Sequence, residues 1–415
     1  MAGDWRAFKV SEFADVIGGG TPKTKVGEYW NGSIPWLTPK DLSNYTGRYV
    51  SKGERNISVK GLSDSSARIL PPKTVLLTSR APVGYLAIAK NELTTNQGFR
   101  SLVVKDRFCP EFIYYLLLNN IEYLKRHASG STFQELSGGT LKELEFEIPA
   151  KTSEQRAIAH ILGSLDDKIE LNRGMNQTLE AKARAIFKSW FVDFDPVRAK
   201  AEGHPTGLPD DVAELFPDSF ENTELGEVPR GWKVGTVADL SNVTSGKRPH
   251  ISSKEKKAGF NVPLYGGGGV MAFVTEPMIT EPFLLTGRVG TLGKIFRITE
   301  PCWPSDNTLL LFPIDKIHLH FLFFMLQRID FDSLNRGSTQ PLVTQTDLKK
   351  QSLVIPSESI MEFFWENASS LFEKIDENNI ESNSLASLRD TLLPKLISGE
   401  LRIPDTEKFV EEAGL

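Results

Sequence analysis

Residues 158–190 read IAHILGSLDDKIELNRGMNQTLEAKARAIFKSW, and the spacing of their apolar residues determines the architecture of the chain. Apolar or small residues recur along it in alternating steps of four and three, which is the heptad spacing of a coiled-coil seam. The seam positions are Ile158, Leu162, Leu165, Ile169, Asn172, Asn176, Leu179, Ala183, Ile186 and Trp190. The stretch therefore predicts a single long helix, of roughly 38 residues and about 57 Å.

The same seam returns 206 residues later, close to the C-terminus. Its positions are Phe364, Ala368, Leu371, Ile375, Asn378, Ser382, Leu385, Arg389, Leu392 and Leu396. We expect capping boxes to open the two helices, Thr152 with Gln155 and Ser359 with Glu362. Because Pro394 lies inside the second helix, we expect its last turns to leave the seam.

Helices of this length with one apolar face need a partner, and the simplest partner for each is the other. A chain that runs block, helix, block, helix favours an antiparallel pair related by a pseudo-two-fold axis. Such a pair brings the seam residues Asn172 and Asn378 opposite each other. Misregister would bury each amide unpaired, at a cost of about 1–3 kcal/mol, so we assign both residues a register role. The alternative is that both are partly solvated and have no such role.

The blocks that precede the two helices are copies of one another. Trp5, Val10, Val16 and Pro22 recur 227 positions later, as Trp232, Val237, Val243 and Pro249. The stretch LLTSRAPVG at 76–84 returns as LLTGRVG at 284–290, which places Arg80 opposite Arg288. An internal repeat of this kind organises the whole chain.

The sequence thus predicts a mixed α/β (α+β) protein in which a two-helix antiparallel coiled coil separates two similar globular domains. The predicted segments are 1–150 (first domain), 151–192 (central helix), 193–225 (a linker rich in Pro, Gly and acids), 226–356 (second domain) and 357–415 (distal helix and tail). Within the domains, we expect strands at 75–78, 86–89, 102–104 and 309–312, and helices at 110–124 and 318–328.

The formal charge of −5 is unevenly distributed along the 415 residues. Residues 1–150 carry 19 Lys and Arg against 15 Asp and Glu, and residues 226–356 carry 15 against 11. Each block therefore has a net charge of +4, and the rest of the chain has −13. Attraction to phosphate depends on the local field, so the two blocks are the parts expected to approach a polyanion.

The usual sequence signs of catalysis are missing. The chain has neither a GxxxxGK[ST] phosphate loop nor the N/D-P-P-Y/F loop with which an amino-methyltransferase holds a flipped base. Cys109 and Cys302 lie far apart, and His318 and His320 have no third ligand nearby, so we predict no metal site and no cofactor in this chain. Without a leader-like or membrane-spanning apolar segment, we expect a cytoplasmic protein with no membrane contact.

The remaining polar residues suit the reading of DNA. Both blocks combine Gly-rich turns, which let the backbone approach closely, with side chains that pair with base edges or phosphates. The candidates in the first block are Thr21, Lys23, Thr38, Lys40, Thr78, Arg80, Asn96, Gln97, Ser129, Gly130, Ser131 and Thr132. Those in the second are Lys247, Arg248, Tyr265, Gly267, Arg288, Asn307, Arg336, Ser338, Thr339 and Gln340. The alternative for each is a solvated loop residue, and for the two repeated arginines a brace to a carboxylate within the fold.

Several segments, in this order, resemble the specificity subunit of a type I restriction-modification system. They are TSEQRAIAHILGSLDDKIELNR at 152–173, AIFKSWFVDFDPVRAK at 185–200, GLPDDVAELFPDSF at 207–220, LGEVPRGW at 225–232 and LRDTLLPKLISGELR at 388–402. The resemblance covers essentially the whole chain. It implies two target-recognition domains that each read one half of a bipartite, asymmetric site in double-stranded DNA, with the helices setting the gap.

The resemblance also implies partners and a division of labour. Two methyltransferase subunits would dock on the helices and linker, and two restriction subunits would complete the assembly as translocase and nuclease. S-adenosylmethionine, ATP and Mg²⁺ would bind those partners, which leaves this chain without catalysis. Shortening both helices by a heptad would then change the gap and leave both half-sites intact. Two alternatives remain: a coiled-coil scaffold without a DNA role, and a stand-alone DNA methyltransferase or nuclease.

Overall fold

The computed structural model describes residues 5–130, 134–337 and 339–403, which form two compact units. Unit 1 contains the described residues of Met1–Gly174 and Asn378–Leu415, and unit 2 is Met175–Glu377. Two helices of 40 residues, α7 (Thr152–Phe191) and α13 (Glu358–Ile397), each contribute one segment to either unit. Both predicted long helices are therefore confirmed.

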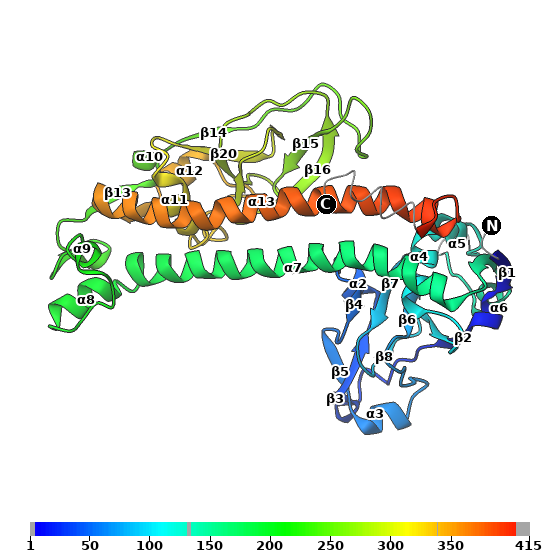
Figure 1. Ribbon diagram of the computed structural model, residues 1–415. Helices are drawn as coiled ribbons and strands as arrows, with labels where there is room; N and C mark the ends of the chain where they lie inside the picture. The colour runs from blue at the N-terminus through cyan, green and yellow to red at the C-terminus, as the bar shows by residue number, and fades with distance from the viewer. Residues whose placement is uncertain (1–4, 131–133, 338, 404–415) are drawn as a thin grey trace. The chain divides into compact units, whose positions relative to one another are not determined.

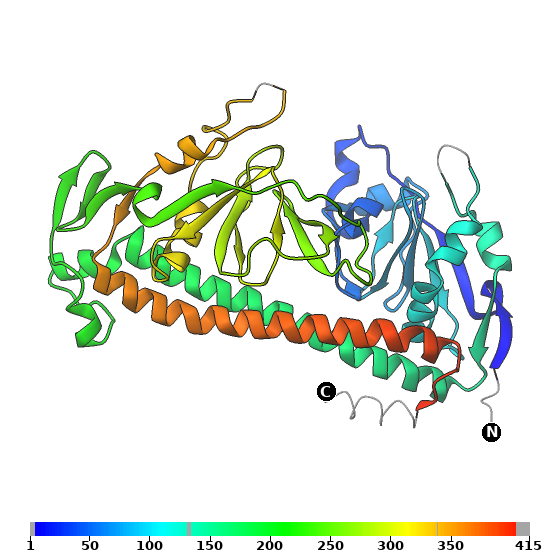
Figure 2. The ribbon, with the colours of Figure 1, turned by 90° about the horizontal axis from the view of Figure 1, so that it is seen from above.

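The helical segments are antiparallel within each unit. In unit 1, Asp166 of α7 lies 2.6 Å from Arg389 of α13, and Lys168 lies 3.4 Å from Glu381. The residue numbers of the partners therefore decrease along α13 as those of α7 increase. In unit 2, the ring of Trp190 near the end of α7 stacks on a ring near the start of α13. Figures 1 and 2 show the paired segments side by side. The antiparallel pairing is as predicted.

Most predicted seam positions are buried, which confirms the heptad interpretation. Those under 9% exposed are Ile158, Leu162, Leu165, Ile169, Asn172, Ala183 and Trp190 in α7, and Phe364, Ala368, Asn378, Leu385, Leu392 and Leu396 in α13. In unit 1 they join one hydrophobic core with the domain's sheet and the helix α4, and in unit 2 they join the corresponding core with α11. Each domain is thus packed onto its own pair of helical segments.

The domain of unit 1 is built on a five-stranded sheet in the order β2-β9-β6-β7-β4, with a three-stranded sheet β5-β3-β8 and a two-stranded sheet β1-β10. The strands are β1 (Trp5–Lys9), β2 (Ala14–Gly18), β3 (Trp30–Leu37), β4 (Tyr49–Val50), β5 (Arg55–Ile57), β6 (Val75–Ser79), β7 (Val83–Ala89), β8 (Thr94–Thr95), β9 (Arg100–Val104) and β10 (Glu145–Pro149). The helices are α1 (Val10–Phe13), η1 (Gly27–Tyr29), α2 (Pro39–Leu42), α3 (Val59–Ser63), α4 (Pro110–Asn119), α5 (Ile121–Arg126) and α6 (Gly138–Glu143).

The domain of unit 2 repeats this plan with a four-stranded sheet β14-β20-β17-β18, a three-stranded sheet β16-β15-β19 and a two-stranded sheet β13-β21. The strands are β13 (Lys233–Thr236), β14 (Ser241–Ser245), β15 (Val262–Gly266), β16 (Gly269–Val274), β17 (Phe283–Gly287), β18 (Phe296–Ile298), β19 (Trp303–Pro304), β20 (Thr308–Pro313) and β21 (Ser352–Ile355). The helices are α10 (Val237–Leu240), α11 (His318–Leu326) and α12 (Gln345–Lys349). The internal repeat is confirmed at the level of strand pairing.

The predicted linker is folded rather than extended. It contains α8 (Asp195–Ala201), α9 (Asp210–Ala213) and β11 (Phe220–Thr223), which forms a hairpin with β12 (Gly226–Pro229) just beyond the predicted boundary. Phe216 of this segment is 2% exposed, and its ring lies 5.3 Å from that of Trp190 on α7. Aromatic burial of this kind secures the segment to the end of the helix within unit 2.

Two predictions about the helix ends are wrong. Helix α7 begins at Thr152 itself, whose hydroxyl donates to the carbonyl of Arg107, and Gln155 bonds instead to the backbone of Cys109 and Pro149. Helix α13 begins at Glu358, so Ser359 lies inside its first turn rather than at its cap. The Thr152 hydroxyl and the Gln155 side chain, which would otherwise have capped α7, are instead bonded to backbone groups just before the start of α4.

The expectation for the end of α13 is also wrong. The helix continues through Pro394 to Ile397, and Leu392 and Leu396 are fully buried in the core of unit 1. The backbone nitrogen of a proline cannot donate a helical hydrogen bond, but apolar burial on both sides of Pro394 outweighs that loss. The seam residue Arg389 is accommodated by its ion pair with Asp166, which is 14% exposed.

Candidate nucleic-acid interface

Backbone hydrogen bonds gather three loops of unit 1 into one cluster. Loop cluster 1 consists of residues 18–23 after β2, 38–40 after β3 and 95–98 between β8 and β9. The amide of Gly20 donates to the carbonyl of Thr95 at 2.9 Å, and the amide of Asn96 donates to Leu37 at 2.8 Å. The indole of Trp36 donates to the carbonyl of Gly20 at 2.9 Å. Segments far apart in the sequence therefore form a single surface.

Glycine is required where these loops cross. A Cβ at Gly19 would lie 2.1 Å from the carbonyl oxygen of Asn96, and one at Gly20 would lie 2.3 Å from the backbone of Ala67. Real side chains do not tolerate such distances from backbone atoms, so the Gly-rich run serves close packing of backbone on backbone.

Four of the polar candidates lie within loop cluster 1 with side chains at the surface. Thr21 is hydrogen-bonded to Gln97, Lys23 is exposed, and Lys40 is exposed 3.2 Å from Glu54. These side chains are available to a ligand, and their contacts with DNA remain a prediction.

Three other candidates are committed to the fold. The Thr38 hydroxyl donates to Asp41 in the capping box that opens α2, and the Asn96 side chain accepts from the amide of Gly98. The Thr78 side chain is fully buried and bonded to Pro82 and Tyr85, so this structure does not offer it to DNA. Thr78 is the clearest correction to the predicted set, because the strand β6 that carries it is covered on both faces.

Arg80 supports the alternative interpretation of a brace. Its guanidinium lies 3.7 Å from Glu135, which also binds Arg100 at 3.0 Å. Ser129 and Gly130 are exposed on the strand-like segment that pairs with Glu135, whereas Ser131 and Thr132 lie outside the described residues.

Unit 2 forms an equivalent cluster from different side chains. Loop cluster 2 consists of residues 245–248, 265–269, 287–290 and 305–308. The amide of Lys247 donates to Pro304 at 3.0 Å and that of Ser305 donates to Tyr265 at 2.9 Å, which matches the two bonds in unit 1. The indole of Trp303 donates to the carbonyl of Lys247 at 2.7 Å, so an indole again holds this loop, but from the neighbouring parallel strand.

The candidates of unit 2 divide between surface and support. Lys247, Arg248 and Asn307 are exposed. Tyr265 donates its hydroxyl to Glu300 at 2.8 Å, and burial raises the pKa of this phenol, so it acts as a neutral donor. A Cβ at Gly267 would lie 2.7 Å from the carbonyl oxygen of Thr291, so this glycine permits close packing of two loops.

The candidates around residue 340 form a separate loop next to α12. Arg336 is paired with Asp347, and the hydrogen bond from the Thr344 hydroxyl, with a smaller effect of Arg336, lowers the pKa of the Asp347 carboxyl. Thr339 and Gln340 are exposed, and Ser338 lies outside the described residues. This loop joins the cluster through the amide of Gly290, which donates to Pro341 at 3.0 Å.

The strand register corrects the alignment of the two arginines. Val16 and Val75 both pair with Leu102, whereas Val243 and Leu284 both pair with Leu311. Val75 is thus equivalent to Leu284, one residue off the alignment of LLTSR with LLTGR. Arg288 accordingly takes the position of Ser79: the amide of Ser79 donates to Gly98 and that of Arg288 to Asn307, at 2.7 and 2.8 Å. A shift of one residue turns a side chain to the other face of a strand.

A buried arginine anchors the domain of unit 1 on its helices. The Arg48 side chain, 8% exposed, bonds to Tyr115 at 3.0 Å and to Asp167 of α7 at 2.6 Å. Tyr115 in turn donates to Asp166 at 2.5 Å, and burial together with Asp166 raises the pKa of this phenol. A Cβ at Gly163 would lie 2.3 Å from the Arg48 guanidinium. Helix α7 therefore makes room for the Arg48 side chain at a position that has no side chain itself.

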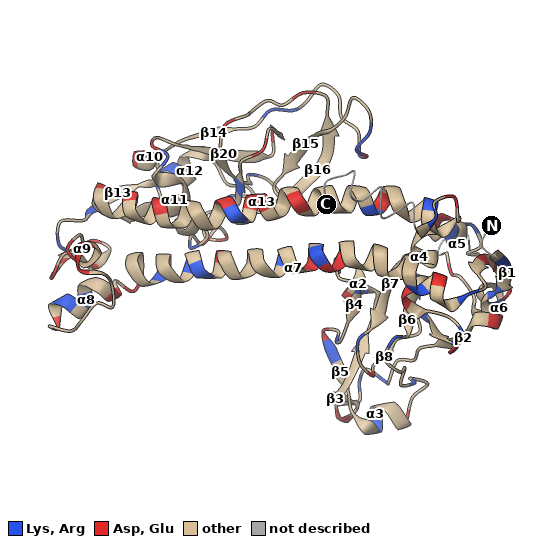
Figure 3. Cartoon of the chain, viewed as in Figure 1, with Lys and Arg blue, Asp and Glu red and all other residues tan. Residues whose placement is uncertain are grey.

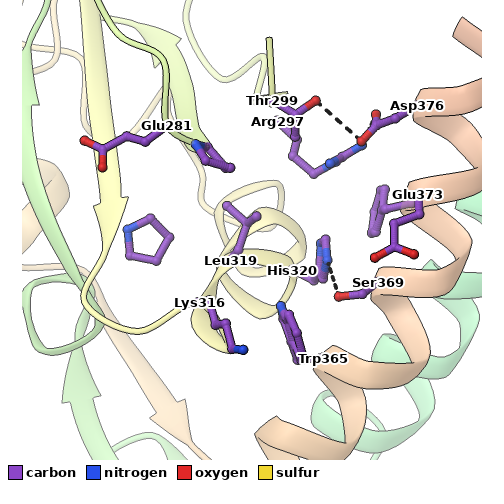
Figure 4. A pocket seen from close by; sticks show the side chains of 13 residues that line it. Glu281, Arg297, Thr299, Lys316, Leu319, His320, Trp365, Ser369, Glu373 and Asp376 are labelled. Atoms are coloured by element: carbon purple, nitrogen blue, oxygen red, sulfur yellow. Dashed lines mark hydrogen bonds and ion pairs between the residues drawn. The ribbon is translucent and has the colours of Figure 1, made fainter. Parts of the chain in front are cut away.

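Unit 2 attaches its domain to α13 around a cavity of about 370 Å³ (Figure 4). Arg297 of β18 pairs with Asp376 at 2.5 Å, and the ring of His320 stacks on Phe372 and bonds to Ser369 at 3.1 Å. Burial, with a smaller effect of Arg297, lowers the pKa of His320 to about 3, so this imidazole is neutral. Ser369 is the repeat equivalent of Gly163, 206 residues later.

The asparagines at the centre of the seam are buried, which contradicts the solvated alternative. Asn172 and Asn378 are 1% and 3% exposed. The Asn172 amide donates to Glu381 at 2.7 Å, to the Ser382 hydroxyl at 3.3 Å and to the Asn378 backbone carbonyl at 3.4 Å. The two residues meet as expected, although the amide of Asn172 bonds to groups other than the Asn378 side chain. Their register role stays a prediction.

Charged side chains of both signs are interspersed along α7, whereas those in the first part of α13, Glu358, Glu362, Glu366 and Glu373, are all acidic (Figure 3). Among the described residues, no cluster of three or more His, Cys, Asp and Glu side chains is arranged to hold a metal ion. Cys109 and Cys302 are buried thiols in different units. None of the helices in the described part of the chain combines the length and apolarity needed to cross a membrane.

Comparisons with known proteins agree with this architecture. A specificity subunit of the type I restriction enzyme MjaIX from Methanocaldococcus jannaschii is 37% identical, over 97% of this chain and 94% of that protein. The HindI specificity subunit of Haemophilus influenzae is 31% identical, over 70% of this chain and 77% of that protein. The crystal structure of a type I restriction-modification S subunit from M. genitalium has the same fold, with a TM-score of 0.60 and 19% identity over 95% of this chain and 96% of that one.

The match to a family description follows the internal repeat. Residues 2–181 and 229–385 each correspond to the type I restriction modification DNA specificity domain. The two matched ranges contain one loop cluster each, and together they cover most of the chain. On these grounds the chain belongs to the family of type I restriction-modification specificity subunits, the non-catalytic components that carry sequence specificity.

Proposed function

We propose that loop clusters 1 and 2 each read one half of a bipartite, asymmetric site in double-stranded DNA. One observation supports this most directly: equivalent backbone positions in the two clusters carry different side chains. Gly20 corresponds to Lys247, Asn96 to Ser305 and Gly98 to Asn307, as the shared hydrogen bonds define. Two domains that share a backbone scaffold but present different side chains suit a DNA site whose two halves differ in sequence.

Helices α7 and α13 are proposed to set the distance between the halves and to dock two methyltransferase subunits. Two restriction subunits would complete the complex as translocase and nuclease. S-adenosylmethionine, ATP and Mg²⁺ would bind these partners and not this chain. A cytoplasmic location, without membrane contact, fits a complex that acts on the genome. The specificity family to which the chain belongs argues against the stand-alone methyltransferase.

The proposal is tested by mapping methylated bases in the genome of cells that express this chain with its partner subunits. We expect two short specified words, unlike each other, separated by a fixed number of unspecified base pairs of about one helical turn. A palindrome, one continuous word, or methylation without sequence preference would contradict the proposal.

A paired variant assigns the words to the units. Replacing Lys247 and Arg248 by glycine and threonine, the residues of unit 1 at these positions, should alter one word and leave the other unchanged. Binding of the assembled complex to its site should also weaken steeply with salt, because phosphate contacts release counterions. A scaffold without a DNA role would show neither effect.

A further inference from the structure

Arg288 of unit 2 differs from Arg80 and Arg100 of unit 1, because no carboxylate partner for its side chain lies among the described residues. Arg80 and Arg100 share Glu135, so each of these two guanidiniums lies within 4 Å of a carboxylate. No carboxylate among the described residues pairs with Arg288, and its buried Nε makes no hydrogen bond. A guanidinium without such a carboxylate is not committed to an ion pair within the fold, so its terminal donors remain open to a ligand.

The backbone around Arg288 is fixed. It directly follows β17, its amide donates to Asn307 at 2.8 Å, and its carbonyl accepts from Val343 at 2.9 Å. These bonds leave the main chain of this residue little freedom. The side chain therefore starts from a defined point.

Glycines lie on both sides of the pair Arg288–Val289. A Cβ at Gly287 would lie 1.7 Å from the carbonyl oxygen of Thr291, and Gly290 has a φ of +82°. Gln340 is the side chain nearest to Gly290, with its amide nitrogen 3.8 Å from where a Cβ would stand. Within 287–290, Arg288 and Val289 therefore carry the only side chains, and the close packing at Gly287 fixes the backbone that presents the arginine.

From these contacts we propose that Arg288 is a specificity-determining residue that reads one guanine in the half-site bound by unit 2. Its two terminal nitrogens donate to O6 and N7 of the guanine in the major groove, the usual pairing of an arginine fork with a base. The equivalent Ser79 in unit 1 is buried and donates to Gly98, so unit 1 has no such reader at this position. This inference rests on the proposed function of loop cluster 2.

The test uses the chain assembled with its methyltransferase subunits and a set of duplexes in which each base pair of the site is changed in turn. The wild-type complex should bind duplexes in which that guanine is replaced more weakly than the intact site. In Arg288→Ala this preference should fall by roughly 5- to 150-fold, at that one position only. Arg80→Ala is the matched control, and it should leave the preference at every position unchanged.

Arg288→Lys keeps a positive charge but lacks the planar fork, so it should bind non-specific DNA as well as wild type and still lose discrimination at the same position. It also serves if the alanine variant does not fold. An equal loss on every duplex, with a shallower salt dependence, would show a phosphate contact and overturn the proposal, as would unchanged specificity. If the wild-type complex itself shows no sequence preference, the proposed function fails first.

Discussion

Gly163 is the residue at which helix α7 admits a side chain from the domain of unit 1. The Arg48 guanidinium lies against it, held by Tyr115 and Asp167. Glycine inside a helix costs about 1 kcal/mol relative to alanine, so its presence here calls for a compensating contact. A buried arginine bonded on two sides provides that contact.

We therefore expect Gly163→Ala to destabilise unit 1 by about 1–2 kcal/mol, because the lost ion pair outweighs the gain in helix propensity. Gly174 of the same helix is the matched control, since an added Cβ there meets no heavy atom of the described residues within 4 Å. Gly174→Ala should stabilise the chain by up to about 1 kcal/mol. Denaturant unfolding of both variants measures the difference, and equal effects would contradict this account.

At this scale the sequence predicted residue types better than positions. Lys23, Lys247 and Arg248 lie exposed as expected. Arg80 and Arg288, however, align only because the two sequence motifs look alike, and they are not equivalent in the structure. Strands β6 and β17 are buried on both faces, so they lack the alternation of apolar and polar residues that reveals a shift of one position. Only the ladder of hydrogen bonds shows which residue occupies which place.

Among the elements, the paired helices carry a polar layer around Asn172 inside a largely apolar seam. Asn172 is buried there and donates to Glu381 and Ser382. An amide in this position has good partners in one register only, whereas leucines slide past one another with less loss.

Asn172→Ala should lower the free energy of unfolding of unit 1 by about 1–3 kcal/mol, because it leaves the Glu381 carboxylate and the Asn378 carbonyl without this donor. Gln177→Ala, at an exposed position on the same helix, should change it by less than about 0.5 kcal/mol. Thermal or urea unfolding of the full chain gives both values. If the two variants were equally stable, the polar layer would have no energetic role.

The long helices were predictable because a heptad seam repeats over ten positions and each position adds to the signal. Their caps were not, because Gln155 bonds to the start of α4, a contact that depends on tertiary structure. The segment at 193–225 reads as a linker from its prolines and glycines, yet Phe216 and Val212 are buried. Short elements held by a few aromatic contacts leave too little periodicity to detect.

For the whole molecule, the two units share a plan and differ in detail. Each attaches a domain to paired helices through a buried basic side chain, Arg48 on Asp167 in one and Arg297 on Asp376 in the other. The repeat was predictable from the sequence, whereas these anchors were not, since Arg48 directly precedes β4 and Arg297 lies within β18, which do not correspond in the repeat. The two domains share an architecture but are attached to the helices by different contacts. Either recognition domain can therefore change in sequence while the other is kept.

The unit boundaries define where the proposed spacing can be changed without touching a domain. Both helices cross from one unit to the other there, after Gly174 in α7 and before Asn378 in α13. Inserting one heptad at each point preserves the seam and adds about 10.5 Å of helix, close to three base pairs of B-DNA. Methylation mapping should then find both specified words unchanged and the gap between them longer by about three base pairs. A heptad inserted in α7 alone is the control: it breaks the register of the pair, and we expect loss of methylation at both the old and the new spacing. If the double insertion alters either word, or leaves the gap as it was, the helices do not set the distance at which the two halves are read.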